Sequence, residues 1–255
     1  MVVRALASTS HPVLAQIIPA RFCNLSCAYC NEYDKVSEPV PLDEMLRRID
    51  HLGRLGTAMI GISGGEPLTH PQLDDIIVRM RKTGAIAGMT TNGYLLDDQA
   101  ADLVAAGIDR VNVSIDSLAQ GRFFEITRRD ALDRVLAGLE AIAAFPEVRP
   151  VKVNAVPMPG FGRDDVLRFC ELAREREFQV RFIEFMPLDG DRAWRAEEVL
   201  TGAKVRAMIE AVHPLVDLPR EAHSTARVCA FADGRGEIGF VNPVSEPFCG
   251  DCNRL

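Results

Sequence analysis

The chain has 255 residues, of which 47% are apolar, and its 29 basic and 36 acidic side chains give a formal net charge of −7. An acidic chain lacks the broad basic surface of most nucleic-acid-binding proteins, so we expect no nucleic-acid partner. No apolar run approaches the roughly 20 residues that a membrane span needs. Residues 1–12 also lack the apolar stretch and cleavage site of a signal peptide. We therefore expect a cytoplasmic protein without membrane contact.

Short β-rich apolar runs alternate with longer amphipathic segments through the first three-quarters of the chain. The expected strands are Val13–Pro19, Ala58–Ser63, Ala85–Thr90, Arg110–Ile115, Val151–Val156 and Val180–Phe185. The expected helices are Leu42–Leu55, Pro71–Lys82, Asp97–Ala106, Ala131–Ala144 and Asp164–Arg176. This alternation predicts an α/β fold of right-handed βαβ units around a parallel sheet. About six units suit a partial, TIM-like (β/α)6 barrel better than a closed barrel of eight.

The alternation fails after about residue 188. Val199–Val212 predicts one further helix, whereas Ala226–Ala232 and Glu237–Val241 predict an antiparallel pair of strands joined by a Gly-containing turn. We expect residues 1–187 to form the barrel and residues 188–255 to form a small C-terminal extension docked on it.

Polar or Gly-rich segments follow the first four expected strands, at residues 21–30, 64–67, 91–93 and 116–117. The carboxyl ends of parallel strands meet at one rim, where barrel enzymes carry their active sites. We therefore expect these segments to converge on a single shared site.

Three cysteines, Cys23, Cys27 and Cys30, follow the first expected strand in the spacing C-x3-C-x2-C. Such clustering in a cytosolic chain indicates metal rather than disulfides. Closely spaced thiolates can wrap an iron–sulfur cube, and three ligands leave one iron open for a cofactor or substrate. The alternatives are a zinc knuckle or three buried structural cysteines. A structural zinc site normally needs four ligands, and no histidine lies at finger spacing.

This triplet, with Tyr29 before its last cysteine, resembles the cluster motif of the radical S-adenosylmethionine (SAM) enzymes. The resemblance implies that Cys23, Cys27 and Cys30 bind a 4Fe–4S cluster whose open iron chelates SAM. It further implies that an electron from the cluster cleaves SAM to a 5′-deoxyadenosyl radical, and that Tyr29 packs near the cofactor. A reducing electron donor is then an expected partner.

Gly64, Gly65 and Glu66 follow the second strand and resemble the Gly-Gly-Glu motif of the same family, whose backbone meets the SAM amino group. Two glycines let a backbone approach a ligand closely, and a carboxylate such as Glu66 can accept hydrogen bonds from an amine. Taken alone, the same residues are ordinary turn chemistry.

Candidate site residues also lie on later strands. Alternation on the fourth strand places Ser114 and Asp116 on one face near its end, although local capping is the ordinary alternative. The family resemblance places Thr90 and Ser114 beside substrate and SAM. It also matches Met186 to a methionine that packs on the SAM adenine, whereas most such methionines fill cores.

Four stretches resemble one subfamily, the GTP 3′,8-cyclases of molybdenum cofactor biosynthesis: Arg110–Ser117, Val151–Val156, Val180–Leu188 and Glu246–Leu255. The resemblance implies a lyase that rearranges GTP into a cyclic pterin precursor. It also implies that Cys249 and Cys252 help to bind a second 4Fe–4S cluster, that Lys152 meets the triphosphate, and that Arg254 lies beside the nucleotide. No side chain is assigned as a catalytic acid, base or nucleophile.

The sequence departs from the cyclase pattern at several places. Gln16, Met59 and Gly61 stand where the subfamily has basic triphosphate contacts, and Leu255 ends the chain ahead of the third cysteine of the second cluster. Asn31–Lys35 are more typical of other radical SAM enzymes than of the cyclase. These features favour an alternative, a radical SAM enzyme with an auxiliary cluster that modifies a peptide or another small molecule.

A third hypothesis is a non-catalytic module that only binds an iron–sulfur cluster or zinc. Cys249 and Cys252 alone would also suit a two-thiol zinc site. The leading hypothesis remains a cyclase-like enzyme, with GTP as its small-molecule substrate and a homodimer as the assembly to consider.

Overall fold

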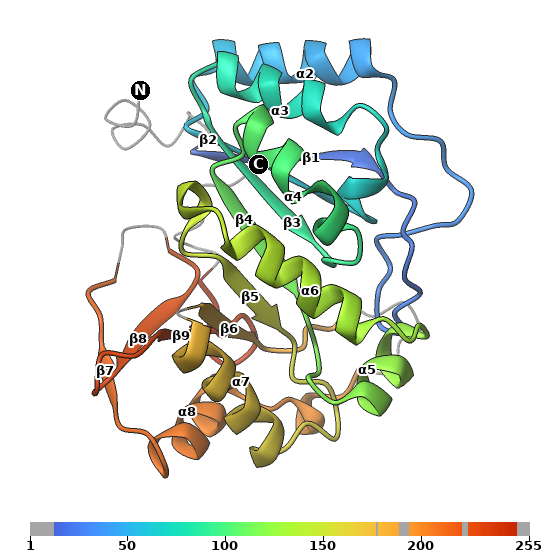
Figure 1. Ribbon diagram of the computed structural model, residues 1–255. Helices are drawn as coiled ribbons and strands as arrows, with labels where there is room; N and C mark the ends of the chain where they lie inside the picture. Colours follow the sequence, from blue (N-terminus) through green and yellow to red (C-terminus); the bar gives the residue numbers. More distant parts are fainter. Residues whose placement is uncertain (1–12, 177, 189–193, 221–223, 249–255) are drawn as a thin grey trace.

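The computed structural model describes residues 13–176, 178–188, 194–220 and 224–248. Within them the strands form one nine-stranded sheet in the order β1-β2-β3-β4-β5-β6-β9-β8-β7 (Figure 1). The strands are β1 (Leu14–Ala20), β2 (Met59–Gly64), β3 (Ile86–Thr91), β4 (Arg110–Ser114), β5 (Lys152–Ala155), β6 (Gln179–Ile183), β7 (Leu215–Asp217), β8 (Arg227–Phe231) and β9 (Glu237–Val241). The neighbouring strands β1, β2, β3, β4, β5, β6 and β9 pair in parallel. Strands β8 and β7 then continue the sheet beyond β9 with antiparallel pairing.

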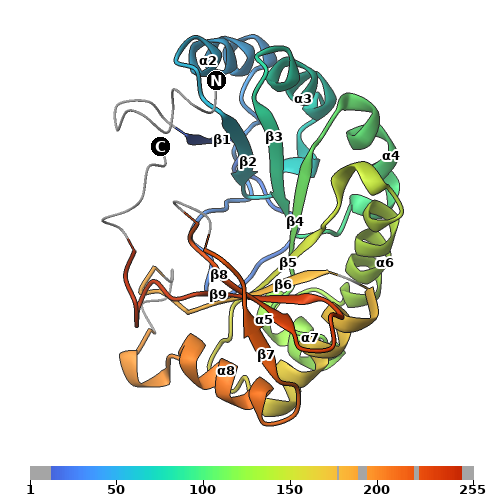
Figure 2. The ribbon, with the colours of Figure 1, turned by 90° about the vertical axis from the view of Figure 1, so that its left-hand side faces the viewer.

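Helices cover the convex side of this curved sheet. The α-helices are α2 (Leu42–Arg54), α3 (Leu73–Lys82), α4 (Leu96–Ala106), α5 (Gln120–Thr127), α6 (Leu132–Ala143), α7 (Arg163–Arg176) and α8 (Gly202–Glu210). The short 3-10 helices are η1 (Pro67–Thr69), η2 (Pro146–Val148) and η3 (Ala196–Glu198). Figure 2 shows the strands in an arc, with α2, α3, α4, α6 and α7 along its outer side. The structure therefore confirms the partial α/β barrel, since β1 and β7 remain the two edges of an open sheet.

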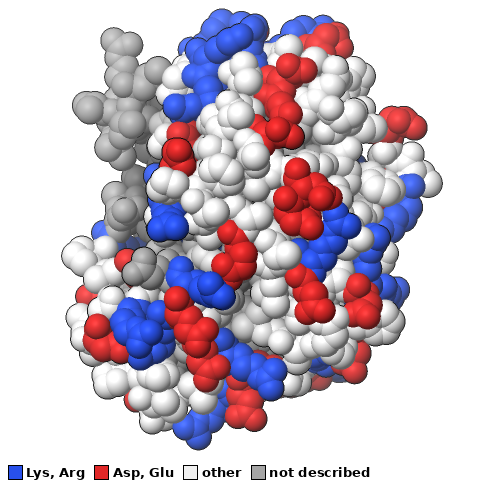
Figure 3. Space-filling view, in the orientation of Figure 1, with Lys and Arg blue, Asp and Glu red and all other residues white. Residues whose placement is uncertain are grey.

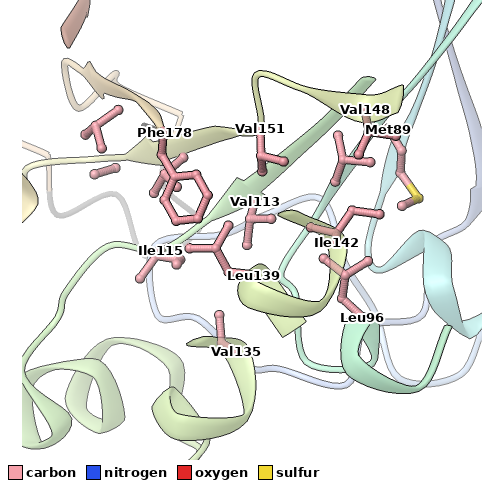
Figure 4. Packing of buried hydrophobic residues seen from close by; sticks show 14 of the residues in the cluster. Met89, Leu96, Val113, Ile115, Val135, Leu139, Ile142, Val148, Val151 and Phe178 are labelled. Atoms are coloured by element: carbon pink, nitrogen blue, oxygen red, sulfur yellow. The ribbon is translucent and has the colours of Figure 1, made fainter. Parts of the chain in front are cut away.

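The main core lies between the sheet and its outer helices. Val135, Leu139 and Ile142 recur at helical spacing along α6, and each is at most 1% exposed. They pack toward Val113 and Ile115 at the end of β4 (Figure 4). Burying one such aliphatic side chain is worth about 1.5–3 kcal/mol, so this face of β4 is committed to packing. The polar residues of β4 alternate with these buried residues and therefore face the concave side of the sheet.

The expected strands and helices of the barrel are present with small differences at their ends. The sequence pattern did not predict α5, since Gly121 and the β-branched residues near its end lower its helix propensity. Buried Phe123 and Ile126 hold this helix against the core instead. The antiparallel pair expected near the end of the chain is β8 and β9. In addition, β9 pairs with β6 along its whole length, which continues the barrel sheet into the extension.

Basic and acidic side chains are interspersed over the face of the molecule shown in Figure 3. None of the helices in the described part of the chain is long and apolar enough to cross a membrane.

Candidate active site

The cysteine triplet lies on residues 23–30, here called the cluster loop, which follows β1. Cys23 is 7% exposed, Cys27 and Cys30 are half-buried, and all three are free thiols. The Cys30 amide donates to the Cys27 carbonyl oxygen at 3.2 Å, so these two cysteines bracket a tight turn. A backbone bridge between Phe22 and Asp34 closes the loop at its base.

The donor set of the cluster loop fits an iron–sulfur cluster better than a single ion. Among the described residues, no three His, Cys, Asp or Glu side chains converge closely enough to hold one metal ion. In a 4Fe–4S cube each thiolate binds a different iron, so its ligands surround the cube instead of meeting at a point. Burial raises the pKa of all three thiols, so metal binding must release their protons.

Two N–H groups hold the sulfur of Cys23. The backbone amide of Leu25 lies 3.4 Å from Cys23 Sγ, and the side-chain amide nitrogen of Asn92 lies 3.6 Å from it. Asn92 also donates to Asn24 Oδ1 at 2.6 Å, which ties the end of β3 to the cluster loop. Sequence reasoning did not single out Asn92, although its place directly after β3 was a usable signal.

Gly64 and Gly65 let the end of β2 pack directly on the start of the cluster loop. A Cβ at Gly65 would lie 2.2 Å from the Arg21 oxygen and 2.4 Å from the Phe22 oxygen, so no side chain fits there. Gly64 has φ +131°, which also favours glycine. The amides of Gly65 and Glu66 donate to carbonyl oxygens of the preceding strand and loop at 3.0 and 2.8 Å. Glycine is therefore required here for backbone packing beside the cluster loop.

The Glu66 carboxylate is enclosed by the protein, at 0% exposure. It accepts hydrogen bonds from the Leu68 amide at 3.1 Å, the Thr91 hydroxyl at 2.6 Å and the Asn92 amide at 2.7 Å. Because three protein donors occupy it, this carboxylate links the ends of β2 and β3. If the Gly-Gly-Glu motif contacts SAM, the backbone of the motif makes the contact and the Glu66 carboxylate does not. The contact itself stays a prediction.

We expect Glu66 to make the stability of the protein fall with rising pH. Burial raises the pKa of Glu66 to about 7 from its ordinary value of 4.5, more than its three donors lower it. A group whose pKa is higher in the folded than in the unfolded protein stabilises the fold when it is protonated. This contribution to the unfolding free energy is complete below the unfolded-state pKa and is lost as the pH rises through the folded-state pKa. The unfolding free energy of the wild type should therefore fall by about 3 kcal/mol relative to Glu66→Gln between about pH 5 and pH 8.

Urea unfolding of the two proteins side by side across this pH range measures the effect. Comparing them cancels the contribution of other titrating groups, the thiols included. The exposed Glu38→Gln variant serves as a control that should follow the wild type. Parallel stability curves for the wild type and Glu66→Gln would show that Glu66 does not titrate in this range.

Tyr29 connects the cluster loop to the ends of β4 and β6. Its hydroxyl donates to Asp116 Oδ2 at 2.5 Å, and Asp116 Oδ1 accepts from the Val156 amide at 2.9 Å. Its ring meets the Phe185 ring edge to face, with centroids 6.3 Å apart. Met186, the next residue, is 36% exposed at the same strand end. The structure therefore brings Tyr29 and the segment of Met186 to one rim, as the alternation predicts.

The concave face of the sheet carries rows of polar side chains. Thr90, Asn112 and Lys152 are neighbours in register on β3, β4 and β5, and the Asn112 amide donates to the Thr90 hydroxyl at 3.2 Å. Ser114 and Asn154 form the next row toward the carboxyl edge. The side-chain oxygen of Asn154 is buried without a hydrogen-bond partner in the described part of the chain. Such an orphaned acceptor suits a site that holds a polar ligand.

A pocket of ≈ 350 Å³ opens beside Lys152. Its charged lining residues are Asp109, Arg110, Arg149, Lys152, Arg181, Arg220 and Glu237. The basic residues of the lining outnumber the acidic ones, and one of the acidic residues, Asp109, already forms an ion pair with Arg81 at 2.6 Å. The lining is therefore basic on balance. Sequence reasoning identified Lys152 but missed Arg181, which strand alternation on β6 could have placed on the concave face. Cys249, Cys252 and Arg254 lie outside the described residues.

Comparisons with known proteins cover nearly the whole chain. The family model for the radical SAM superfamily matches residues 17–173, and the model named Molybdenum Cofactor Synthesis C matches residues 178–255. The GTP 3′,8-cyclase of Rhodopirellula baltica is 39% identical over 248 residues, which cover 91% of this chain and 68% of that protein. The cyclase of Thermodesulfovibrio yellowstonii is 37% identical over 91% of this chain and 74% of its own length.

This chain belongs to the GTP 3′,8-cyclase family of radical SAM enzymes. Solved structures agree with the fold: Streptococcus suis SuiB bound to its precursor peptide SuiA has a TM-score of 0.68 at 18% identity, over 80% of this chain and 46% of that one. TYW1 with a lysine-pyruvate adduct has a TM-score of 0.59 at 18% identity, over 89% and 81%. At such identities the likeness concerns the fold alone, so SuiB does not favour a peptide substrate here.

Membership of this family confirms an enzyme that uses a 4Fe–4S cluster and SAM, and it removes the hypothesis of a module that only binds metal. The cluster loop of this radical SAM enzyme carries the fitting donors, Cys23, Cys27 and Cys30.

Proposed function

We propose that this radical SAM enzyme catalyses the GTP 3′,8-cyclase reaction of molybdenum cofactor biosynthesis. Identity to curated cyclases over 91% of the chain supports the reaction class. The observation that carries the substrate is the basic pocket beside Lys152, at the amino ends of β4, β5 and β6. Lysine and arginine side chains form strong, charge-assisted hydrogen bonds with phosphate, so this pocket suits the triphosphate of GTP.

The proposed roles of the other residues follow their places on the rim. Cys23, Cys27 and Cys30 would hold the 4Fe–4S cluster, which when bound would supply the electron for the cleavage of SAM. The side chains of Tyr29, Ser114 and Met186 line the SAM site together with the backbone of Gly64, Gly65 and Glu66. Thr90 lies in the same row as Lys152 and contacts the substrate.

Gln16, Met59 and Gly61 stand where the family resemblance expects basic triphosphate contacts, and in this structure they pack against neighbouring strands instead. A Cβ at Gly61 would lie 2.7 Å from the side-chain oxygen of Gln16, so Gln16 fills the space above this glycine. The methyl group of Met59 lies 2.6 Å from the Cβ position of Gly88 in the same way. The cations of the pocket come instead from β4, β5 and β6, from Arg149 just before β5 and from Arg220. We infer that the triphosphate lies toward β4–β6.

For residues 188–255 we propose an extension that completes the nucleotide site of the barrel formed by residues 1–187. In this proposal Cys249 and Cys252 help to bind a second 4Fe–4S cluster, and Arg254 contacts the nucleotide. The match of residues 178–255 to the molybdenum cofactor synthesis model supports this assignment. Iron counting on the reconstituted protein distinguishes a second cluster from a two-thiol zinc site. A reducing electron donor and a homodimer remain predictions.

Lys152→Ala is expected to weaken GTP binding by about 1.5–3 kcal/mol, the usual range for hydrogen bonds to charged groups. Cleavage of SAM without substrate should stay almost unchanged, because the proposed SAM contacts come from other loops. Anaerobic calorimetry with GTP, together with an assay for 5′-deoxyadenosine, measures both effects. Lys204→Ala, at an exposed position on α8, is the matched control. Wild-type protein that binds SAM but shows no detectable GTP binding would exclude the cyclase reaction for this chain.

A further inference from the structure

The segment Asn31–Lys35 is not used by the proposed function, yet it folds back onto the cluster loop. Asp34 forms a backbone bridge with Phe22, and its amide donates to the Arg21 oxygen at 3.0 Å. An Arg21–Asp34 ion pair at 3.5 Å adds to this closure. The fold-back brings the next residue, Lys35, beside the cysteine ligands.

The ammonium group of Lys35 binds two carbonyl groups of the cluster loop. Its Nζ atom lies 2.5 Å from the Cys23 oxygen and 2.6 Å from the Leu25 oxygen. The same atom lies 5.7 Å from the ring centroid of Phe22 and 5.1 Å from that of Tyr33. Cation–π contacts at these distances favour an ammonium group, so the surroundings are built for a positive charge.

Arg129, which follows α5, binds the carbonyl group between those two. Its Nη1 atom donates to the Asn24 oxygen at 2.7 Å, and its guanidinium stacks 4.2 Å from the ring centroid of Tyr94. The peptide unit whose oxygen Arg129 binds is the one whose Leu25 N–H points at Cys23 Sγ, 3.4 Å away. Lys35 and Arg129 together therefore hold the carbonyl groups of three consecutive residues, 23, 24 and 25.

We propose that Lys35 and Arg129 form a two-cation clamp that positions the cluster loop and raises the reduction potential of its 4Fe–4S cluster. Arg129 fixes the peptide that donates to the Cys23 sulfur, and Lys35 fixes the peptides on either side. Hydrogen bonds to sulfur and nearby charge are two of the factors that set the potential of an iron–sulfur cluster. Reduction adds negative charge, so cations beside the loop stabilise the reduced state.

The inference rests on the cluster assignment of the family but not on GTP as the substrate. Both residues act through the loop, so we regard them as positioning residues. Lys35 is an exposed residue, which predicts that its effect on the potential weakens at high salt.

The test is an anaerobic redox titration, followed by EPR, of the cluster whose signal responds to SAM. Lys35→Met keeps the length of the side chain and removes its charge, whereas Lys35→Arg keeps charge and donors. Arg129→Met removes the second cation. Lys82→Met, at an exposed position at the end of α3, controls for the loss of a remote charge. Iron content is measured on every protein, and GTP takes no part.

The expected result is a more negative midpoint potential in Lys35→Met and in Arg129→Met, with wild-type values in Lys35→Arg and Lys82→Met. Full iron content with unchanged potentials in both methionine variants of the clamp would overturn the proposal. If Lys35→Met loses iron, full loading of Lys35→Arg supports the clamp, and an equal loss in Lys35→Arg overturns it. The iron content of the wild type tests the cluster assignment itself, separately from these comparisons.

Discussion

Single replacement of Cys23, Cys27 or Cys30 by alanine should abolish reductive cleavage of SAM. It should also lower the iron content of the reconstituted protein by about four atoms per chain, the content of one 4Fe–4S cluster. A thiolate bond to iron has no substitute nearby, because the other free cysteines of the described residues, Cys170 and Cys229, are buried in α7 and β8. The measurements are iron and sulfide content and the yield of 5′-deoxyadenosine under anaerobic, reducing conditions.

Cys170→Ala is the matched control for these variants. Cys170 is 0% exposed within α7, so its loss affects core packing without touching the cluster loop. The control should keep wild-type iron content and SAM cleavage. Wild-type iron content and SAM-responsive EPR signals in all three cluster-loop variants would mean that the cluster lies elsewhere.

Glu184→Ala should destabilise the protein by about 3 kcal/mol or more, since it leaves several buried donors without an acceptor. Glu184 is 2% exposed and lies directly after β6. Its carboxylate accepts from the Gly202 amide at 3.0 Å, the Val244 amide at 3.0 Å and the Ser245 amide at 2.8 Å. It also accepts from the Ser245 hydroxyl at 2.5 Å. One side chain thus joins the barrel, α8 and the segment that leads to Cys249.

Glu184→Gln should cost less than Glu184→Ala, because it keeps one of the two acceptor oxygens. The exposed Glu198→Ala variant on η3 should change stability by no more than about 0.5 kcal/mol. Urea unfolding of the reconstituted proteins measures all three. If Glu184→Ala unfolds at the urea concentration of Glu198→Ala, the buried hydrogen bonds of Glu184 do not hold the extension in place.

Much of the fold and part of the site could be predicted from the sequence because their signals are local. The alternation of apolar runs and amphipathic segments predicts the strands from β1 to β6 and the helices α2, α3, α4, α6 and α7, since both periodicities lie within a few residues. The spacing of Cys23, Cys27 and Cys30 indicates an iron–sulfur loop for the same reason. The sequence pattern does not predict helix α5, because its residues have weak helix propensity and its helical conformation depends on burial against the core.

The same limit applies to the basic pocket beside Lys152. Lys152 was found by resemblance, whereas the basic pocket depends on the register that sets β4, β5 and β6 side by side. That register brings Arg110 and Arg181 to the pocket of Lys152, and the fold of the extension adds Arg220. These cations supply positive charge that Gln16 and Met59 lack. The sequence alone does not show that the fold brings them together.

The sequence by itself determined the partial parallel barrel and the family, and it predicts the cluster ligands, because residue spacing and periodicity are properties of short stretches of chain. Only the tertiary structure decided what surrounds those ligands. Glu66 is enclosed by donors from β3, and Arg129 reaches a cluster loop that lies about a hundred residues earlier in the chain. Lys35 binds the same loop because the chain turns back after Cys30. Contacts of this kind depend on how distant segments pack, and no local pattern in the sequence specifies them.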